Sequence, residues 1–294
     1  MNPLEGRRLV IFGCGYIGSA AARAGAARGA KVIALTRNAD TAALLRADGV
    51  ETVVSDLAGD GWHARIPGGP DFVLNCVSSG GGGLDAYRHS YVGGAASILA
   101  WVRRAGAAGT AVYTSSTSVY PQGGGATVDE TASTEGGGER AQLLLQAENA
   151  MRDATGAWRR SFVLRLAGIY GPGRHQLIEQ LRSGEIAGVG EHRLNLIHRD
   201  DVVAAIFACF AAPADVGGDV FNVADDEPTR KSDVVAWLAA RLAVPFPRFT
   251  GGSGPPPRRV TSDRLIGNAK LRSRLGWRPQ YPSFRAGYES FLSP

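Results

Sequence analysis

A glycine-rich turn between two short apolar strands constrains the fold of this chain more than any other feature. An apolar run at residues 9–12 leads directly into the turn, which reads Gly13-Cys14-Gly15-Tyr16-Ile17-Gly18. A helix-forming run of small residues and a second apolar strand at 31–35 follow. This is the G-x-G-x-x-G pattern within a βαβ unit of roughly 30 residues, the context that dinucleotide binding requires. The glycines allow a tight turn, close approach of a diphosphate and close helix packing, so the turn predicts a dinucleotide on the N–H groups at the start of the helix.

The residues that end the second strand predict which dinucleotide binds. NAD-binding units place Asp or Glu there, about 20 residues beyond the glycines, to accept from the ribose 2′-hydroxyl. This chain has Thr36-Arg37 instead. A guanidinium pairs well with a 2′-phosphate, and no carboxylate is present to repel one. We therefore predict NADP(H) in preference to NAD(H), the alternative being that Arg37 is a solvated loop arginine.

Short apolar runs alternate with helical patterns along most of the chain. The strand-like runs lie at 9–12, 31–35, 52–54, 72–76, 111–114 and 162–166, with helical patterns at 40–48, 84–104 and 139–154 between them. Such alternation predicts an α/β fold with a Rossmann-type, doubly wound parallel sheet. It weakens after residue 171, and we expect a Rossmann domain over 1–170 and a smaller substrate-binding lobe over 171–294, interleaved with the sheet.

Composition and charge exclude several classes of protein. Three widely spaced cysteines, Cys14, Cys76 and Cys209, indicate neither a disulfide framework nor a metal site, and are typical of a cytoplasmic protein. The net charge of +5 comes almost wholly from arginine, without the basic helix or aromatic stripe of a nucleic-acid-binding protein. No apolar stretch has the roughly 18 residues that a membrane span needs. A small-molecule substrate is the expected partner.

With these features assembled, the chain resembles the extended branch of the short-chain dehydrogenase/reductase superfamily, the NAD-dependent epimerase/dehydratase group. The resemblance covers nearly the whole length. Besides the glycine turn, it rests on segments 55–57, 75–78, 113–120, 165–173, 197–202 and 221–226, which read SDL, NCVS, YTSSTSVY, RLAGIYGPG, IHRDDV and FNVADD.

The resemblance implies roles for individual residues. Asp56 would accept from the adenine amino group and Leu57 would pack on the ring, whereas Asp56 could otherwise be a turn carboxylate. Ser116 would bond the reacting oxygen of the substrate. His198 would lie on the substrate side, or else be a helix-start histidine held by backbone. The remaining implied contacts are Cys76, Val77 and Ser78 at the ribose, Leu166 and Gly168 beside the nicotinamide, and Arg174 at the substrate.

The chain departs from the family where proton transfer takes place. Family dehydrogenases use a Tyr-x-x-x-Lys pair, in which the lysine lowers the pKa of a tyrosine that is otherwise near 10. Here Arg140 stands at the tyrosine position and Leu144 at the lysine position. Phe12 also replaces the first glycine of the extended G-x-x-G-x-x-G turn. These differences resemble the atypical members of the superfamily, some of which bind nucleotide without turnover.

Two functions follow as hypotheses. The first is an NADP(H)-dependent reductase, epimerase or dehydratase acting on a small hydroxylated or nucleotide-linked substrate. Ser116 would polarise the reacting oxygen, Tyr91, Tyr120 or water would supply the proton, and Arg140 would stabilise an oxyanion or bind a substrate phosphate or carboxylate. Packing beside the nicotinamide is the alternative for both tyrosines. The second hypothesis is a non-catalytic NADP(H)-sensing or regulatory protein, and either could act as a monomer or a homodimer.

Overall fold

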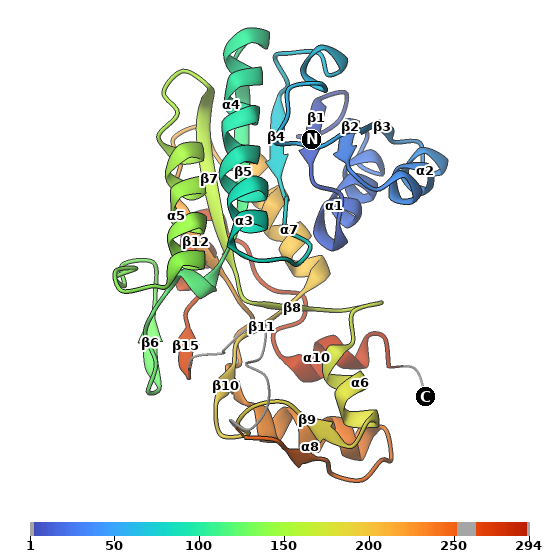
Figure 1. Ribbon diagram of the computed structural model, residues 1–294, viewed down its shortest axis with the longest axis vertical. Helices are drawn as coiled ribbons and strands as arrows, with labels where there is room; N and C mark the ends of the chain where they lie inside the picture. The colour runs from blue at the N-terminus through green and yellow to red at the C-terminus, as the bar shows by residue number, and fades with distance from the viewer. Residues whose placement is uncertain (1–2, 252–262, 293–294) are drawn as a thin grey trace.

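Seven parallel strands form the central sheet of the computed structural model, which describes residues 3–251 and 263–292. They are β1 (Arg8–Phe12), β2 (Lys31–Thr36), β3 (Glu51–Val54), β4 (Phe72–Asn75), β5 (Ala108–Ser116), β7 (Trp158–Leu166) and β12 (Val220–Val223). Their order across the sheet is β12-β7-β5-β4-β1-β2-β3 (Figure 1). Because the order reverses between β1 and β4, a crevice opens there beyond the carboxyl ends of the strands. The predicted doubly wound sheet is confirmed.

Helices cover both faces of this sheet. They are α1 (Tyr16–Ala26), α2 (Ala39–Ala47), α4 (Gly94–Ala105), α5 (Glu139–Arg152) and α7 (Arg199–Phe210). Successive side chains of a strand point to opposite faces, so Leu9 and Ile11 join one core with α1 and α7. Phe12 joins a second core, under α4, with Trp62 and Trp101. The strands are nearly continuous apolar runs because both of their faces are buried.

The helix predicted at 84–104 has an irregular beginning. It starts as α3 (Leu84–Tyr87), widens into a π-helical segment at Arg88–Gly93, and continues as α4. Single π-helical turns inside helices occur frequently at functional sites. Here the segment carries Tyr91, one of the predicted site residues.

The second half of the chain adds a smaller lobe beyond the carboxyl edge of the sheet, below it in Figure 1. The lobe has its own core, formed among others by Ile178, Leu194, Val234 and Phe284. Its strands form two-stranded pairs, β8 (Gly168–Tyr170) with β11 (Leu196–His198), β9 (Glu185–Ile186) with β14 (Arg248–Phe249), and β10 (Arg193–Leu194) with β13 (Thr229–Arg230). A further pair, β6 (Ala126–Val128) with β15 (Arg264–Ile266), packs against the core of the main sheet. The helices of the lobe are α6 (Gln176–Arg182), α8 (Lys231–Arg241) and α10 (Phe284–Glu289), whereas α9 (Ala269–Leu275) packs against β12 of the main sheet.

The chain passes between these two parts more than once, since α7 and β12 return to the main sheet. The Pro-rich stretch noted in the sequence, Pro255–Pro257, lies outside the described residues. Among the residues that are described, no helix has the length and apolar character needed to cross a bilayer.

Candidate functional site

The glycine turn after β1 has the geometry that its sequence predicts. Gly13 has φ +88°, and a Cβ placed on it would lie 2.7 Å from the Val77 Cα. A Cβ on Gly18 would lie 2.1 Å from the Gly13 carbonyl oxygen. Both distances are shorter than any real carbon contact. Only glycine therefore lets this turn pack against the end of β4.

The first turn of α1 faces open space. Its N-cap, Gly15, offers no side chain to the unpaired N–H groups, and the first turn contains no acidic residue. A Cβ on Gly15 would meet no atom of the described chain within 4 Å. Because the first N–H groups of a helix have no partner within it and carry partial positive charge, this arrangement suits an anion.

A pocket of about 160 Å³ opens at this turn and extends along the carboxyl edge of the sheet. It brings together most residues predicted for the cofactor and the chemistry. The predicted residues that line it are Gly15, Tyr16, Ile17, Cys76, Val77, Ser78, Tyr91, Ser116, Leu166 and Arg174. Thr114, Ser115, Leu144, Ala167 and Ile169 complete the wall. Gly168 lies between two residues of this wall, and its N–H donates to the Asn195 carbonyl at 2.9 Å.

The reacting end of the pocket combines a hydroxyl, a phenol and an apolar wall. Ser116 ends β5, and its Oγ accepts a hydrogen bond from the N–H of Ser118 at 3.1 Å, which directs the hydroxyl hydrogen elsewhere. Tyr91 lies on the wall formed by the π-helical segment. Leu144, which the resemblance aligns with the lysine of the Tyr-x-x-x-Lys pair, is 3 % exposed and lines the pocket. The wall is therefore apolar at this position.

The structure does not bring Arg140 to the pocket wall. Arg140 is exposed near the start of α5, and its guanidinium lies over the ring of Tyr87, 5.2 Å from the centroid. The Tyr87 ring in turn lies 5.1 Å from that of Tyr91. Arg140 is thus not among the residues that line the pocket, and the Tyr87 ring lies between its guanidinium and Tyr91.

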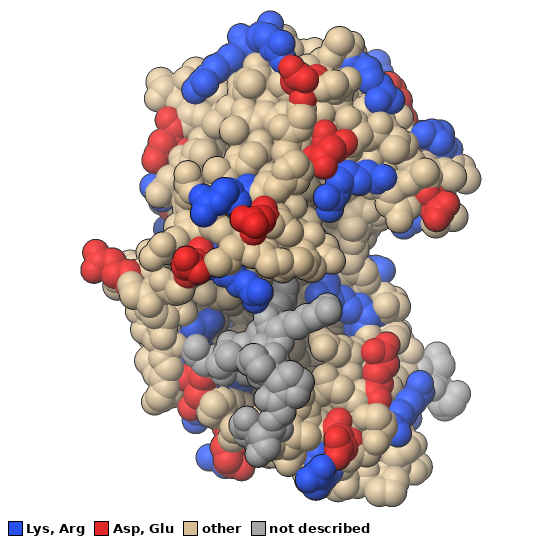
Figure 2. Space-filling view, viewed as in Figure 1, with Lys and Arg blue, Asp and Glu red and all other residues tan. Residues whose placement is uncertain are grey.

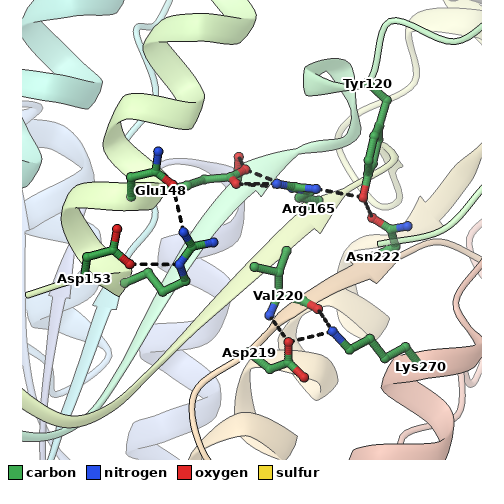
Figure 3. A network of polar contacts seen from close by, with 11 residues as sticks. Tyr120, Glu148, Asp153, Arg165, Asp219, Val220, Asn222 and Lys270 are labelled. Atoms are coloured by element: carbon green, nitrogen blue, oxygen red, sulfur yellow. Dashed lines mark hydrogen bonds and ion pairs between the residues drawn. The ribbon is translucent and has the colours of Figure 1, made fainter. Parts of the chain in front are cut away.

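Tyr120 also lies away from the pocket, within a buried polar network (Figure 3). Its hydroxyl donates to Asn222 Oδ1 and accepts from Arg165 Nη1, both at 2.9 Å. Burial raises the pKa of Tyr120, although the Arg165 charge opposes this effect. A phenol held on both sides in this way has a structural role, so the structure places Tyr120 neither where it could transfer a proton to a substrate nor beside the pocket.

The same network reaches the pocket through a residue that the sequence did not indicate. Arg165 on β7 donates to both carboxylate oxygens of Glu148 on α5, at distances down to 2.7 Å. Ser115, which lines the pocket, donates to Glu148 at 2.5 Å. The only sequence signal for Ser115 was its place in the Ser-rich end of β5. The ion pair fixes that strand end beneath the pocket.

His198 is buried and caps α7, in agreement with the alternative of a helix-start histidine held by backbone. It is 1 % exposed, and its Nδ1 accepts from the N–H of Asp200 at 3.3 Å. Burial lowers its pKa, and its ring packs against Tyr281 with centroids 4.1 Å apart. The structure therefore does not place His198 on the pocket wall.

The residues predicted to bind the adenosine part of the cofactor follow β2 and β3, beside the pocket. His89 Nε2 lies 3.0 Å from Asp56 Oδ2, and the N–H of Ala58 donates to Asp56 Oδ1 at 2.9 Å. Burial raises the pKa of Asp56, but the His89 and Ala58 hydrogen bonds and the Arg37 charge outweigh it and lower the pKa overall. His89 was not predicted, and it belongs to the π-helical segment that the sequence pattern did not reveal.

Leu57 and Arg37 have different surroundings at this end. Leu57 is 3 % exposed and packs under α4, its Cδ2 3.0 Å from where a Gly94 Cβ would be, instead of presenting a face for a ring. Arg37 is exposed, and its guanidinium lies 3.8 Å from where a Cβ of Gly80 would be. The glycine-rich loop after β4 therefore passes close to Arg37.

Comparisons with known proteins agree with this architecture. The model of the NAD dependent epimerase/dehydratase family matches residues 9–224. Protein YeeZ of Escherichia coli K12 is 31 % identical over 173 residues, which are 58 % of this chain and 58 % of YeeZ. This chain thus matches little more than half the length of that curated relative.

Solved structures match over nearly the full length. A conserved protein of unknown function from Silicibacter pomeroyi is 28 % identical with a TM-score of 0.76, and the match covers 97 % of each chain. UDP-glucuronic acid 4-epimerase from Bacillus cereus, solved with UDP-glucuronic acid and NAD, is 17 % identical with a TM-score of 0.80, and covers 96 % of each chain. At that identity the second match shows a shared fold.

Proposed function

This chain belongs to the NAD-dependent epimerase/dehydratase family, and from that premise we propose that it is an NADP(H)-dependent enzyme of the atypical kind. Its substrate would be a small hydroxylated or nucleotide-linked molecule, reduced, epimerised or dehydrated. One observation carries the proposal. A single pocket joins the open first turn of α1 to Ser116 and Tyr91. A protein that only bound nucleotide would not need these groups beside the nicotinamide end.

The preference for NADP(H) is supported by the charge at the end of β2. Arg37 is exposed beside the Gly80 loop, and Asp56, whose pKa the Arg37 charge helps to lower, is engaged by His89. A 2′-phosphate could accept two hydrogen bonds from the guanidinium.

The variant Arg37→Met tests this preference. Because hydrogen bonds to charged groups contribute about 1.5–3 kcal/mol, we expect the Kd for NADPH to rise about ten- to hundredfold while that for NADH stays the same. Fluorescence titration of both cofactors measures this, with the exposed Arg46→Met on α2 as control. Tighter binding of NADH than of NADPH to the unaltered protein would contradict the assignment.

The pocket residues suggest how the chemistry proceeds. The nicotinamide, when bound, would supply or accept hydride. Ser116 would donate its hydroxyl hydrogen to the reacting oxygen of the substrate, which stabilises the charge that develops there. Tyr91, or water beside it, would give or take the proton. Leu144 would exclude water from the wall where relatives place a lysine.

Ser116→Ala is the test of this chemistry. Turnover is first sought with NADPH and a panel of ketones, hydroxy compounds and sugar nucleotides, followed by absorbance. For a substrate so found, we expect kcat to fall about 10²- to 10³-fold in Ser116→Ala, because one polarising donor is lost. Ser118→Ala is the matched control, since its exposed side chain lies two residues away. Unchanged turnover in Ser116→Ala would overturn the site assignment.

A second function is favoured by the replaced pair. Leu144 lines the pocket and Arg140 lies over the ring of Tyr87. Neither side chain can therefore carry out the proton transfer of the tyrosine and lysine in the family's pair. An NADP(H)-sensing protein without turnover would show cofactor binding and no reaction across the panel. That result would decide for the sensing function.

A further inference from the structure

The side chain of Tyr16 leaves the glycine turn and docks against the entrance to the lobe. Its hydroxyl donates to the Pro172 carbonyl at 3.0 Å. Gly171 has φ +142°, and a Cβ on it would lie 2.9 Å from Tyr16 Oη and 3.1 Å from His198 Nε2. The tight fit of these groups fixes the segment 171–174 against the first turn of α1.

Two guanidinium groups lie over the ring of Tyr16. The Cζ of Arg174 is 5.4 Å from its centroid and that of Arg199 is 5.5 Å away. Both are within the range of a cation–π contact. Arg174 lines the pocket together with Gly15, Tyr16 and Ile17. Its charge therefore faces the same pocket as the first N–H groups of α1.

The position of Arg199 follows from the cap of α7. It is the first residue of that helix, directly after the buried cap His198. Its Nε donates to Asp200 at 2.8 Å, which fixes the guanidinium, and its side chain is 25 % exposed. His198, predicted as a substrate residue, thus orients the start of α7 and with it Arg199.

We propose that Arg174 and Arg199, stacked on Tyr16, form a diphosphate clamp. These two arginines of the lobe side would bind the same cofactor diphosphate as the N–H groups of the α1 turn, an inference that rests on the proposed function. Both arginines share one anchor, Tyr16, which belongs to the turn itself. The first turn of α1 contains no acidic residue, and the carboxylate that pairs with Arg199, Asp200, engages its Nε. Basic side chains gather at the waist between sheet and lobe (Figure 2), and a guanidinium matches phosphate geometry.

The clamp makes a prediction that separates the diphosphate from the 2′-phosphate. NADPH and NADH carry the same diphosphate, so Arg174→Met and Arg199→Met raise the Kd of both by the same factor, about tenfold or more. Adenosine 2′-monophosphate lacks the diphosphate, so its affinity does not change in these variants. Arg37→Met gives the opposite pattern, weakening NADPH and adenosine 2′-monophosphate while leaving NADH unchanged.

Controls and contrary results are distinct. Arg230→Met removes an exposed lobe arginine that pairs with Glu191, and leaves every Kd unchanged. Arg174→Lys keeps the charge but not the planar fork, and gives an intermediate Kd, with thermal melts to verify folding. If the unaltered protein binds both cofactors and Arg174→Met binds them equally well, the clamp is wrong and the proposed function stands. If the unaltered protein binds neither cofactor, the proposed function fails and the clamp with it.

Discussion

Asp225, the residue next but one after β12, shows how burial, together with nearby carboxylates, sets the behaviour of a side chain. It is 2 % exposed; its Oδ1 accepts from the N–H of Glu227 at 3.2 Å, and its Oδ2 has no hydrogen-bond partner among the described residues. Burial of the carboxylate raises its pKa from 3.8 to about 8. At neutral pH this residue is therefore largely a neutral acid.

This raised pKa predicts a pH dependence of stability. Between about pH 4 and pH 8 the unfolded chain has Asp225 ionised while the folded chain keeps it protonated, so folding takes up a proton. The free energy of unfolding should consequently fall as pH rises through this window, by up to about 1.4 kcal/mol per unit from this residue, and level off above pH 8.

Asp225→Asn removes the titrating group and keeps the acceptor for Glu227. We expect urea denaturation at pH 5, 6.5 and 8 to show a shallower decline for this variant, and greater stability than the unaltered protein at pH 8. Asp215→Asn, exposed and remote from that site, is the control. Equal slopes for Asp225→Asn and the unaltered protein would show that the carboxylate is ionised when folded.

At the scale of residues, the sequence indicates which side chains lie at the carboxyl edge of the sheet. Ser116 ends β5 and Ser78 lies just beyond β4, and both line the pocket. His198 ends β11 and Tyr120 lies just beyond β5, but the interior holds both rings. The sequence gives the end of a strand and its edge of the sheet. It does not say whether a large ring beyond that end turns inward.

At the scale of elements, a buried ion pair joins α5 to β7. Arg165 and Glu148 are 7 % and 1 % exposed as side chains, and Ser115 and Tyr120 satisfy further hydrogen bonds around them. Removing one partner of such a pair leaves an uncompensated charge in the interior. The loss of stability then comes from the partner that stays behind with its charge unpaired.

Arg165→Met should therefore lower the free energy of unfolding by about 3–5 kcal/mol, because Glu148 loses its partner. Urea denaturation measures this. Arg152→Met, which breaks the exposed pair with Asp153 at the end of the same helix, should cost under about 1 kcal/mol. A similarly small loss for Arg165→Met would mean that the pair contributes little to α5 docking.

Element prediction was most successful for the sheet. The run predicted at 31–35 is β2 (Lys31–Thr36) and that at 162–166 lies within β7, because strands buried on both faces have an apolar sequence signature. The π-helical segment was not predicted, because no local pattern in the sequence distinguishes a wide helical turn from an ordinary one. It packs against α5, a contact between segments far apart in the sequence.

At the scale of the whole molecule, the order of the strands places the glycine turn and the end of β4 on either side of one crevice. That position followed from the predicted fold class. The closeness of residues 171–174 and the start of α7 to the same turn did not, because contacts between distant segments have no sequence period. The lobe thus contributes Ile169 and Arg174 to a pocket whose other walls belong to the sheet and the helices that cover it.

The binding of NADPH to the α1 turn is the central claim, and Gly15→Val tests it most directly. Gly15 has φ −79°, which valine tolerates, and open space lies where a Cβ would project. The variant should fold with an unchanged Tm in the absence of cofactor. Millimolar NADPH should raise the Tm of the unaltered protein, as a ligand bound only to the folded state must, and leave that of Gly15→Val unchanged. Equal NADPH-induced shifts in both proteins, or no shift in either, would contradict the account.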